Sequence, residues 1–260
     1  MKNNLVIGAA FNYDIEKIQP FVKSLRSCYH GKVTLLTQNV DDATDKYYKA
    51  NNIDQFKVSD SLNWEYINVL RFELFHRYLN SIDTTDYDKI LIIDTRDVIF
   101  QIDPFVNTDL SNLYFYAEPE LIGSCATNSA WYKHLYGYEG LNLVKNKPIV
   151  CGGSILGKRK SILNLMEIFW TEFIRLISES RGFGACDQAI LNHLAHVVIE
   201  NKIIGGTFSS NVATLHHAKI FQFNSSGQLL NECGTPTPVV HQYDRHTVTR
   251  KILTANLGIN

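Results

Sequence analysis

Residues 88–105, Asp-Lys-Ile-Leu-Ile-Ile-Asp-Thr-Arg-Asp-Val-Ile-Phe-Gln-Ile-Asp-Pro-Phe, carry the strongest signal for the fold. The unbroken apolar run at 90–93 is typical of a strand buried on both faces, as in a parallel sheet covered by helices. The run stops at Asp94, which Arg96 and Asp97 follow closely. Because open α/β sheets bind ligands beyond the carboxyl ends of their strands, we expect these three side chains at a ligand site.

The two carboxylates, Asp94 and Asp97, are hard ligands suited to Mg²⁺ or Mn²⁺, and such an ion can hold a diphosphate. An alternative interpretation is purely structural. Aspartate is a common turn residue, so both could cap a turn, with Asp97 paired to Arg96.

The rest of the chain alternates between segments with strand and helix patterns, which predicts an α/β fold with right-handed crossovers. With no internal repeat or linker, residues 1–260 are expected to form a single domain whose first 105 residues are a nucleotide-binding half. The expected strands are 5–11, 32–37, 56–58, 90–93, 113–117 and 149–156, and the expected helices are 15–25, 41–50, 63–79, 125–137, 159–178 and 187–196.

Composition narrows the class of protein. The net charge of −1, with no basic stripe, argues against nucleic-acid binding. The five cysteines contain no C-x-x-C pair and indicate a reducing compartment. The amino-terminal apolar segment is too short for a signal peptide, and no apolar stretch is long enough for a transmembrane segment. A cytoplasmic protein is therefore expected, peripheral to a membrane only if its acceptor lies there.

Three further segments carry residues suited to chemistry. Gly152 and Gly153 interrupt an apolar run, which indicates either close approach to a ligand or a bulge. Asp187 and Gln188 open the D-Q-x-x-L-N segment, where the aspartate could simply be a helix N-cap. His241 follows the apolar pair at 239–240, and a lone histidine there could equally be structural.

The ordered set of a D-x-x-D, a glycine-containing strand, D-Q-x-x-L-N and a late histidine resembles GT-A fold glycosyltransferases. The closest likeness is to the retaining group that contains glycogenin and the lipopolysaccharide galactosyltransferases, and it spans about residues 5–246. The resemblance implies a GT-A fold, a Rossmann-like mixed sheet flanked by helices of the nucleotide-diphospho-sugar transferase type. It also implies that residues 106–260 form the half that binds sugar and acceptor.

The same resemblance implies a glycosyltransferase that uses Mn²⁺ or Mg²⁺ and a nucleotide-sugar donor, with a UDP-sugar favoured. The acceptor would be a hydroxyl of a glycan or of a lipid-linked or protein-linked substrate. The residues assigned to these roles are Asp94, Asp97 and His241 for the metal, Asp187 and Gln188 for catalysis, and Phe11, Asn12, Arg71, Asp94, Arg96, Gly152 and Gly153 for nucleotide and sugar.

The chain departs from the family pattern at two motifs. Arg96 stands where the second aspartate of a D-x-D is usual, so either Asp94 and Asp97 both reach the metal, or Arg96 takes over part of the cation's role. Arginine can bind two diphosphate oxygens at once, so a role for Arg96 in place of part of the cation's charge is chemically reasonable. Cys151-Gly-Gly-Ser replaces the family's N-A-G pattern, so the detailed sugar contacts do not carry over.

Other classes fit less well. A haloacid dehalogenase-type phosphohydrolase needs an early strand ending in D-x-D-x-T, and Asp94 is neither early nor followed by that pattern. A sugar nucleotidylyltransferase needs a glycine-rich basic loop after the first strand, where this chain has Gly8-Ala-Ala-Phe-Asn-Tyr. A catalytically inactive sugar-nucleotide or glycan-binding protein of the same fold remains the alternative from a different functional class.

Overall fold

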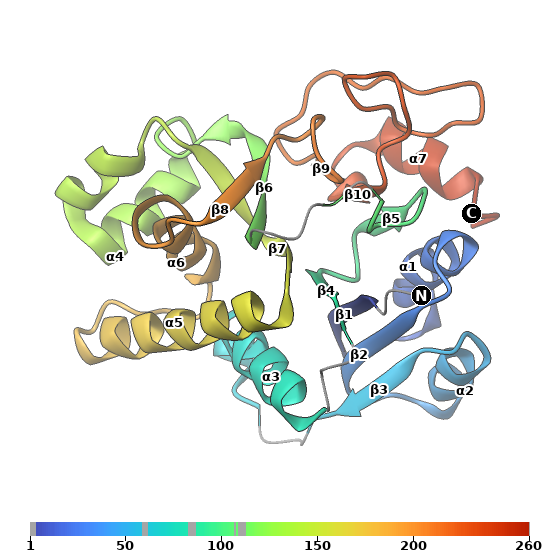
Figure 1. Cartoon of the computed structure of the whole chain (residues 1–260), viewed down its shortest axis with the longest axis horizontal. Helices are drawn as coiled ribbons and strands as arrows, with labels where there is room; N and C mark the ends of the chain where they lie inside the picture. Colours follow the sequence, from blue (N-terminus) through green and yellow to red (C-terminus); the bar gives the residue numbers. More distant parts are fainter. Residues whose placement is uncertain (1–3, 59–61, 83–86, 107, 109–112, 260) are drawn as a thin grey trace.

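The computed structural model describes residues 4–58, 62–82, 87–106, 108 and 113–259, and Figure 1 shows a central sheet with helices around it. The main sheet has the order β3-β2-β1-β4-β7-β6-β8. β1 to β4 are mutually parallel, β7 is antiparallel to β4 and β6, and β8 is parallel to β6. The predicted α/β class with a mixed sheet is confirmed. The strands are β1 (Asn4–Phe11), β2 (Lys32–Gln38), β3 (Asp54–Lys57), β4 (Lys89–Ile93), β6 (Leu113–Leu121), β7 (Pro148–Gly157) and β8 (Lys202–Gly205).

β4 is buried on both faces, as its apolar run predicts. Ile90 and Ile92 belong to the core on one face of the sheet, and Leu91 and Ile93 to the core on the other. This alternation follows from the two-residue period of a strand. A strand of this kind has no solvent face, so polar residues can begin only at its end, where Asp94 stands.

Two of the helices begin at aspartate caps that the sequence makes recognisable. The Asp14 carboxylate accepts from the Lys17 amide at 3.0 Å, and the Asp41 carboxylate accepts from the Thr44 amide at 2.7 Å. The helices are α1 (Ile15–Cys28), α2 (Asp42–Ala50), α3 (Ile67–Ser81), α4 (Ala126–Val144), α5 (Arg159–Ser178), α6 (Asp187–His193) and α7 (Thr247–Ala255).

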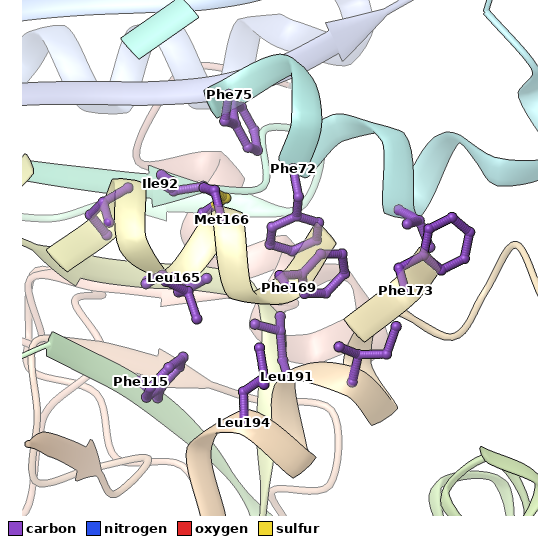
Figure 2. Close-up of a cluster of buried hydrophobic side chains, with 14 of the residues drawn as sticks. Phe72, Phe75, Ile92, Phe115, Leu165, Met166, Phe169, Phe173, Leu191 and Leu194 are labelled. Atoms are coloured by element: carbon purple, nitrogen blue, oxygen red, sulfur yellow. The ribbon is translucent and has the colours of Figure 1, made fainter. Parts of the chain in front are cut away.

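The larger core lies where α3, α5 and α6 cover one face of the sheet. Figure 2 shows the rings of Phe72 from α3 and Phe169 from α5 side by side in this core. They stack with centroids 4.2 Å apart, and both are fully buried or nearly so. α1 covers the opposite face through Ile18, Phe21 and Leu25. The helices thus cover both faces of the sheet and leave the carboxyl end of β4 for a site.

A second, three-stranded sheet lies beyond the carboxyl end of β4. Its order is β5 (Val98–Phe100), β10 (Val239–His241) and β9 (Val212–Thr214). β5 and β10 are antiparallel, and their register pairs His241 with Val98. This pairing brings the last part of the chain against the residues that directly follow the acidic loop (Figure 1).

The structure differs from the sequence-based expectation in the second half. β5, β8, β9, β10 and α7 are not among the expected elements, because each is short or lies in a segment with little periodicity. β7 includes Gly152 and Gly153, and its pairing with β6 shifts register between Val150 and Ile155. The helix expected to reach residue 196 is α-helical only to His193 and continues as a π-turn over Leu194–Val198. α4 extends to Val144, with a break at Gly137 (φ +71°).

Two broader expectations can be compared with the described residues. None of their helices combines the length and the apolar character needed to cross a bilayer. All five cysteines are free thiols, in line with the absence of a disulfide pattern in the sequence.

Candidate functional site

The loop at the end of β4 is tied to both neighbouring strands. The Asp94 amide donates to the Gly153 carbonyl of β7 at 2.8 Å, and the Thr95 hydroxyl donates to the Ala9 carbonyl of β1 at 2.6 Å. The Asp97 carbonyl in turn accepts from the Gln242 amide at 2.7 Å, just after β10. The loop is therefore held from three directions, and its carboxylates have fixed positions.

Asp94, Asp97 and His241 converge, as the sequence predicts. His241 Nε2 lies 3.5 Å from Asp94 Oδ2 and 3.6 Å from Asp97 Oδ1. One ligand atom from each residue lies within 4.8 Å of the others. Two carboxylates and one imidazole suit Mn²⁺ or Mg²⁺, so the chemistry of the donor set fits the implied ion.

A buried nitrogen without a hydrogen-bond partner supports a cation at this position. His241 is 1% exposed, yet its Nε2 has no hydrogen-bond partner of acceptable geometry. Burial opposes a charged imidazole, but Cys151 and the two neighbouring carboxylates outweigh it and raise the pKa of His241 above its ordinary value. A buried nitrogen that faces two carboxylates without a hydrogen bond of acceptable geometry suits a metal ion, which would displace the imidazole proton on binding.

The paired glycines of β7 make room for this group. A Cβ on Gly153 would lie 2.6 Å from His241 Cε1 and closer still to Asp94 Oδ2. A Cβ on Gly152 would meet Asp187 Oδ2 at 3.2 Å. Both readings of the glycines therefore apply: they allow close approach of Asp187, Asp94 and His241, and the β6–β7 pairing shifts register between Val150 and Ile155, where they lie.

Arg71 of α3 links the two acidic positions. Its Nη1 donates to Asp94 Oδ1, and its Nη2 donates to Asp187 Oδ2 at 2.8 Å and to the Gly152 carbonyl at 3.2 Å. Burial would raise the pKa of Asp94, but Arg71 and His241 outweigh burial and lower it. For Asp187, burial outweighs Arg71 and raises the pKa. The two carboxylates thus share one cation but differ in proton affinity.

Asp187 is not a helix cap, because Cys186 occupies the cap position and Asp187 is the first residue of α6. The next polar residues of the D-Q-x-x-L-N segment hold α6 on β7. Gln188 Oε1 accepts from the Gly152 amide at 3.1 Å, and Asn192 bonds both backbone groups of Val150 at 2.8 and 2.9 Å. Gln188 and Asn192 position the helix, and Asp187 is left to face Arg71.

A cavity of about 320 Å³ opens beside the acidic loop. Its walls combine aromatic rings with charged side chains. Trp64 meets Phe11 edge to face with centroids 6.2 Å apart. The lining residues are Ala9, Phe11, Tyr13, Trp64, Ile67, Asn68, Arg71, Asp94, Thr95, Arg96, Asp97, Gln242 and Arg245.

The remaining predicted residues differ in whether they line this cavity. Phe11, Arg71 and Arg96 line it. Arg96 also pairs with Asp97 at 3.1 Å, so the ion pair of the turn interpretation exists alongside the metal-type cluster. Asn12 is not among the lining residues; it has a left-handed backbone (φ 56°), and its Oδ1 accepts from the Asn39 side chain at 2.8 Å.

Sequence reasoning missed Glu118 of β6, which lies next to Gln188. Gln188 Nε2 donates to Glu118 Oε1 at 3.3 Å, and the glutamate is only 2% exposed. Burial raises the pKa of Glu118 to about 7. The sequence-based prediction also missed Arg245 after β10, which lies 3.4 Å from Asp97. The sequence held a weak signal for Glu118, a charged residue directly after the apolar run at 113–117.

Comparison with known proteins identifies no family: no family model matches the chain, and no curated protein matches it.

Proposed function

We propose that this protein is a GT-A-type glycosyltransferase that moves a sugar from a nucleoside-diphosphate donor, with UDP favoured, to a hydroxyl of a glycan or of a lipid-linked or protein-linked acceptor. The observation that carries the proposal is the convergence of Asp94, Asp97 and His241 at the edge of a cavity with aromatic walls. Ligands of open α/β sheets bind at this position relative to the strands.

Asp94, Asp97 and His241 would hold the Mn²⁺ or Mg²⁺, which when bound supplies positive charge against the diphosphate of the leaving group. Arg96 and Arg245 line the same cavity and add donors suited to phosphate oxygens. Phe11 and Trp64 offer ring faces and edges for a nucleotide base. One cavity thus presents groups for base and diphosphate together.

Asp187 is the residue best suited to the sugar side of the reaction. It is separated from Asp94 only by the Arg71 guanidinium and carries a carboxylate in a buried position. As positive charge develops at the anomeric carbon, a fixed carboxylate there gains interaction energy. Arg71 positions this carboxylate, and Gln188 holds its helix against β7.

Calorimetry of UDP binding with and without Mn²⁺ tests the nucleotide and metal parts. We expect Mn²⁺ to strengthen UDP binding, and Asp97→Asn to abolish that gain because the amide removes a charged ligand. Asp88→Asn is the matched control, since the exposed Asp88 precedes β4 at its opposite end. UDP affinity that is equal with and without Mn²⁺ but reduced in Arg96→Ala would instead favour arginine as the phosphate clamp.

Turnover separates the enzyme from a binding protein of the same fold. A panel of UDP- and GDP-sugars is incubated with Mn²⁺, and released nucleoside diphosphate is measured with and without acceptor glycans. Release from one donor that depends on Asp187 supports transfer. Tight metal-dependent UDP binding with no release from any donor in the panel would favour the inactive binding protein.

A further inference from the structure

A second group of potential metal ligands lies outside the cluster assigned above. Glu118 of β6 and the consecutive histidines His216 and His217, which follow β9, each offer one ligand atom, and these atoms lie within 4.8 Å of one another. β6 belongs to the main sheet and β9 to the small one, so the group joins the two sheets. Neither histidine has a role in the proposed transfer reaction.

We propose that Glu118, His216 and His217 form a second cation site, selective for a divalent transition metal of the Zn²⁺ type. Two imidazoles and one carboxylate are a known ligand set for Zn²⁺ with an open fourth position. An ion about 2.1 Å from each ligand needs the ligand atoms within about 4 Å of one another, so small side-chain rotations would complete the site.

The buried carboxylate is the feature that points to a ligand. Glu118 is 2% exposed, and its Oε1 is satisfied by Gln188. Its Oε2 lies 3.3 Å from His217 Nε2 but has no hydrogen bond of acceptable geometry. An ordinary Glu–His hydrogen bond would have satisfied both atoms, so the contact leaves a buried carboxyl oxygen without a partner.

The two histidines are arranged to present their nitrogens together. Their rings stack with centroids 4.4 Å apart and an interplanar angle of 5°. The His216 amide donates to Gln242 Oε1 at 3.2 Å, and the Leu215 amide before it donates to the His241 carbonyl at 3.0 Å. These bonds fix the turn after β9, and the exposed side of His216 leaves an open coordination position toward solvent.

The two sites differ in ligand chemistry, which makes them separable by experiment. Asp94, Asp97 and His241 provide two carboxylates and one imidazole, which suit Mg²⁺ or Mn²⁺. The second group has one carboxylate and two imidazoles, and sites rich in imidazole prefer Zn²⁺ or Co²⁺ over Mg²⁺. Excess Mg²⁺ should therefore fill the first site and leave the second available to a transition metal.

The test is a titration of the full chain with Co²⁺ in excess Mg²⁺, followed by visible d–d absorption, and a matched Zn²⁺ titration by calorimetry. We expect one Co²⁺ per chain. We expect each of three substitutions to lower the Co²⁺ affinity by at least about tenfold: His217→Ala, His216→Ala and Glu118→Gln. Loss of a residue that only supports a metal ligand already costs about tenfold, and loss of the ligand itself should cost at least as much. The exposed His30, replaced by alanine, is the control for loss of a surface imidazole.

Asp97→Asn distinguishes the two sites and should leave Co²⁺ binding in Mg²⁺ intact. The proposal is overturned if the wild type binds no Co²⁺ in Mg²⁺, if all three substitutions leave binding unchanged, or if Asp97→Asn alone abolishes it. None of these outcomes depends on glycosyl transfer. Circular dichroism of each variant confirms the fold, and the surface location of His216 makes its alanine variant the one least dependent on core packing.

Discussion

Arg71 and Asp187 form a hydrogen-bonded ion pair of 2.8 Å across 116 positions of sequence, and the same guanidinium also bonds Asp94. The side chains of Arg71 and Asp187 are 16% and 11% exposed. Two carboxylates this close to each other would repel strongly without a shared cation. Arg71 is therefore the residue whose positive charge opposes this repulsion before any substrate arrives.

Arg71→Ala should lower the free energy of unfolding by about 3–5 kcal/mol at neutral pH, because it leaves the buried Asp187 carboxylate unpaired. Urea denaturation measures the free energy of unfolding of both proteins. Arg77→Ala on the same helix is the control, since Arg77 pairs with Glu73 but is 60% exposed, and such pairs contribute about 0–1 kcal/mol. Similar small losses in both variants would contradict the bridging role.

Asp187→Ala and Asp187→Ser should both lower kcat by about 10²-fold or more while donor affinity changes little. Serine can replace an N-cap, but Asp187 lies inside the first turn and Cys186 occupies the cap. The capping interpretation predicts that serine restores turnover. Steady-state kinetics on whichever donor the protein uses will separate the two, and near-normal kcat in Asp187→Ser would rule out a catalytic role.

Gly153→Ala should weaken Mn²⁺ binding and lower the free energy of unfolding by about 1–3 kcal/mol, because its Cβ would overlap Asp94 and crowd His241. Gly152→Ala is a neighbouring control, since its Cβ comes no closer than 3.2 Å to another heavy atom. Mn²⁺ binding followed by electron paramagnetic resonance gives the comparison. Equal metal affinity in the two variants would show that space at Gly153 is not what shapes the site.

Glu118→Gln should become more stable relative to the wild type as pH rises from about 4.5 to 7 in a chelating buffer. Burial raises the pKa of Glu118 from 4.5 to about 7, so in this window the folded state binds a proton that the unfolded state has lost. Wild-type stability therefore falls with rising pH, by up to about 3 kcal/mol from this group.

Urea denaturation across this pH range measures the difference. The exposed Glu139, replaced by glutamine, should follow the wild-type profile. A constant stability difference between Glu118→Gln and the wild type over the whole range would mean that Glu118 is not desolvated in solution.

The sequence by itself determined the first half of the fold and the identity of the acidic loop. Local patterns suffice there: the apolar run at 90–93 has no solvent face, helices alternate with strands, and Asp14 caps a helix as its position predicts. Carboxylates at the end of such a strand must lie at the sheet edge, because strand direction and end are both readable from the chain.

Only the tertiary structure decided how distant residues meet. The pairing of His241 with Val98 results from a three-residue strand in a segment with little periodicity, and strands this short have no clear pattern. The Arg71 bridge depends on the rotation of α3 against the sheet, which packing of Phe72 on Phe169 fixes. The joining of Glu118 to His216 and His217 depends on contact between two sheets, and no local preference encodes that contact.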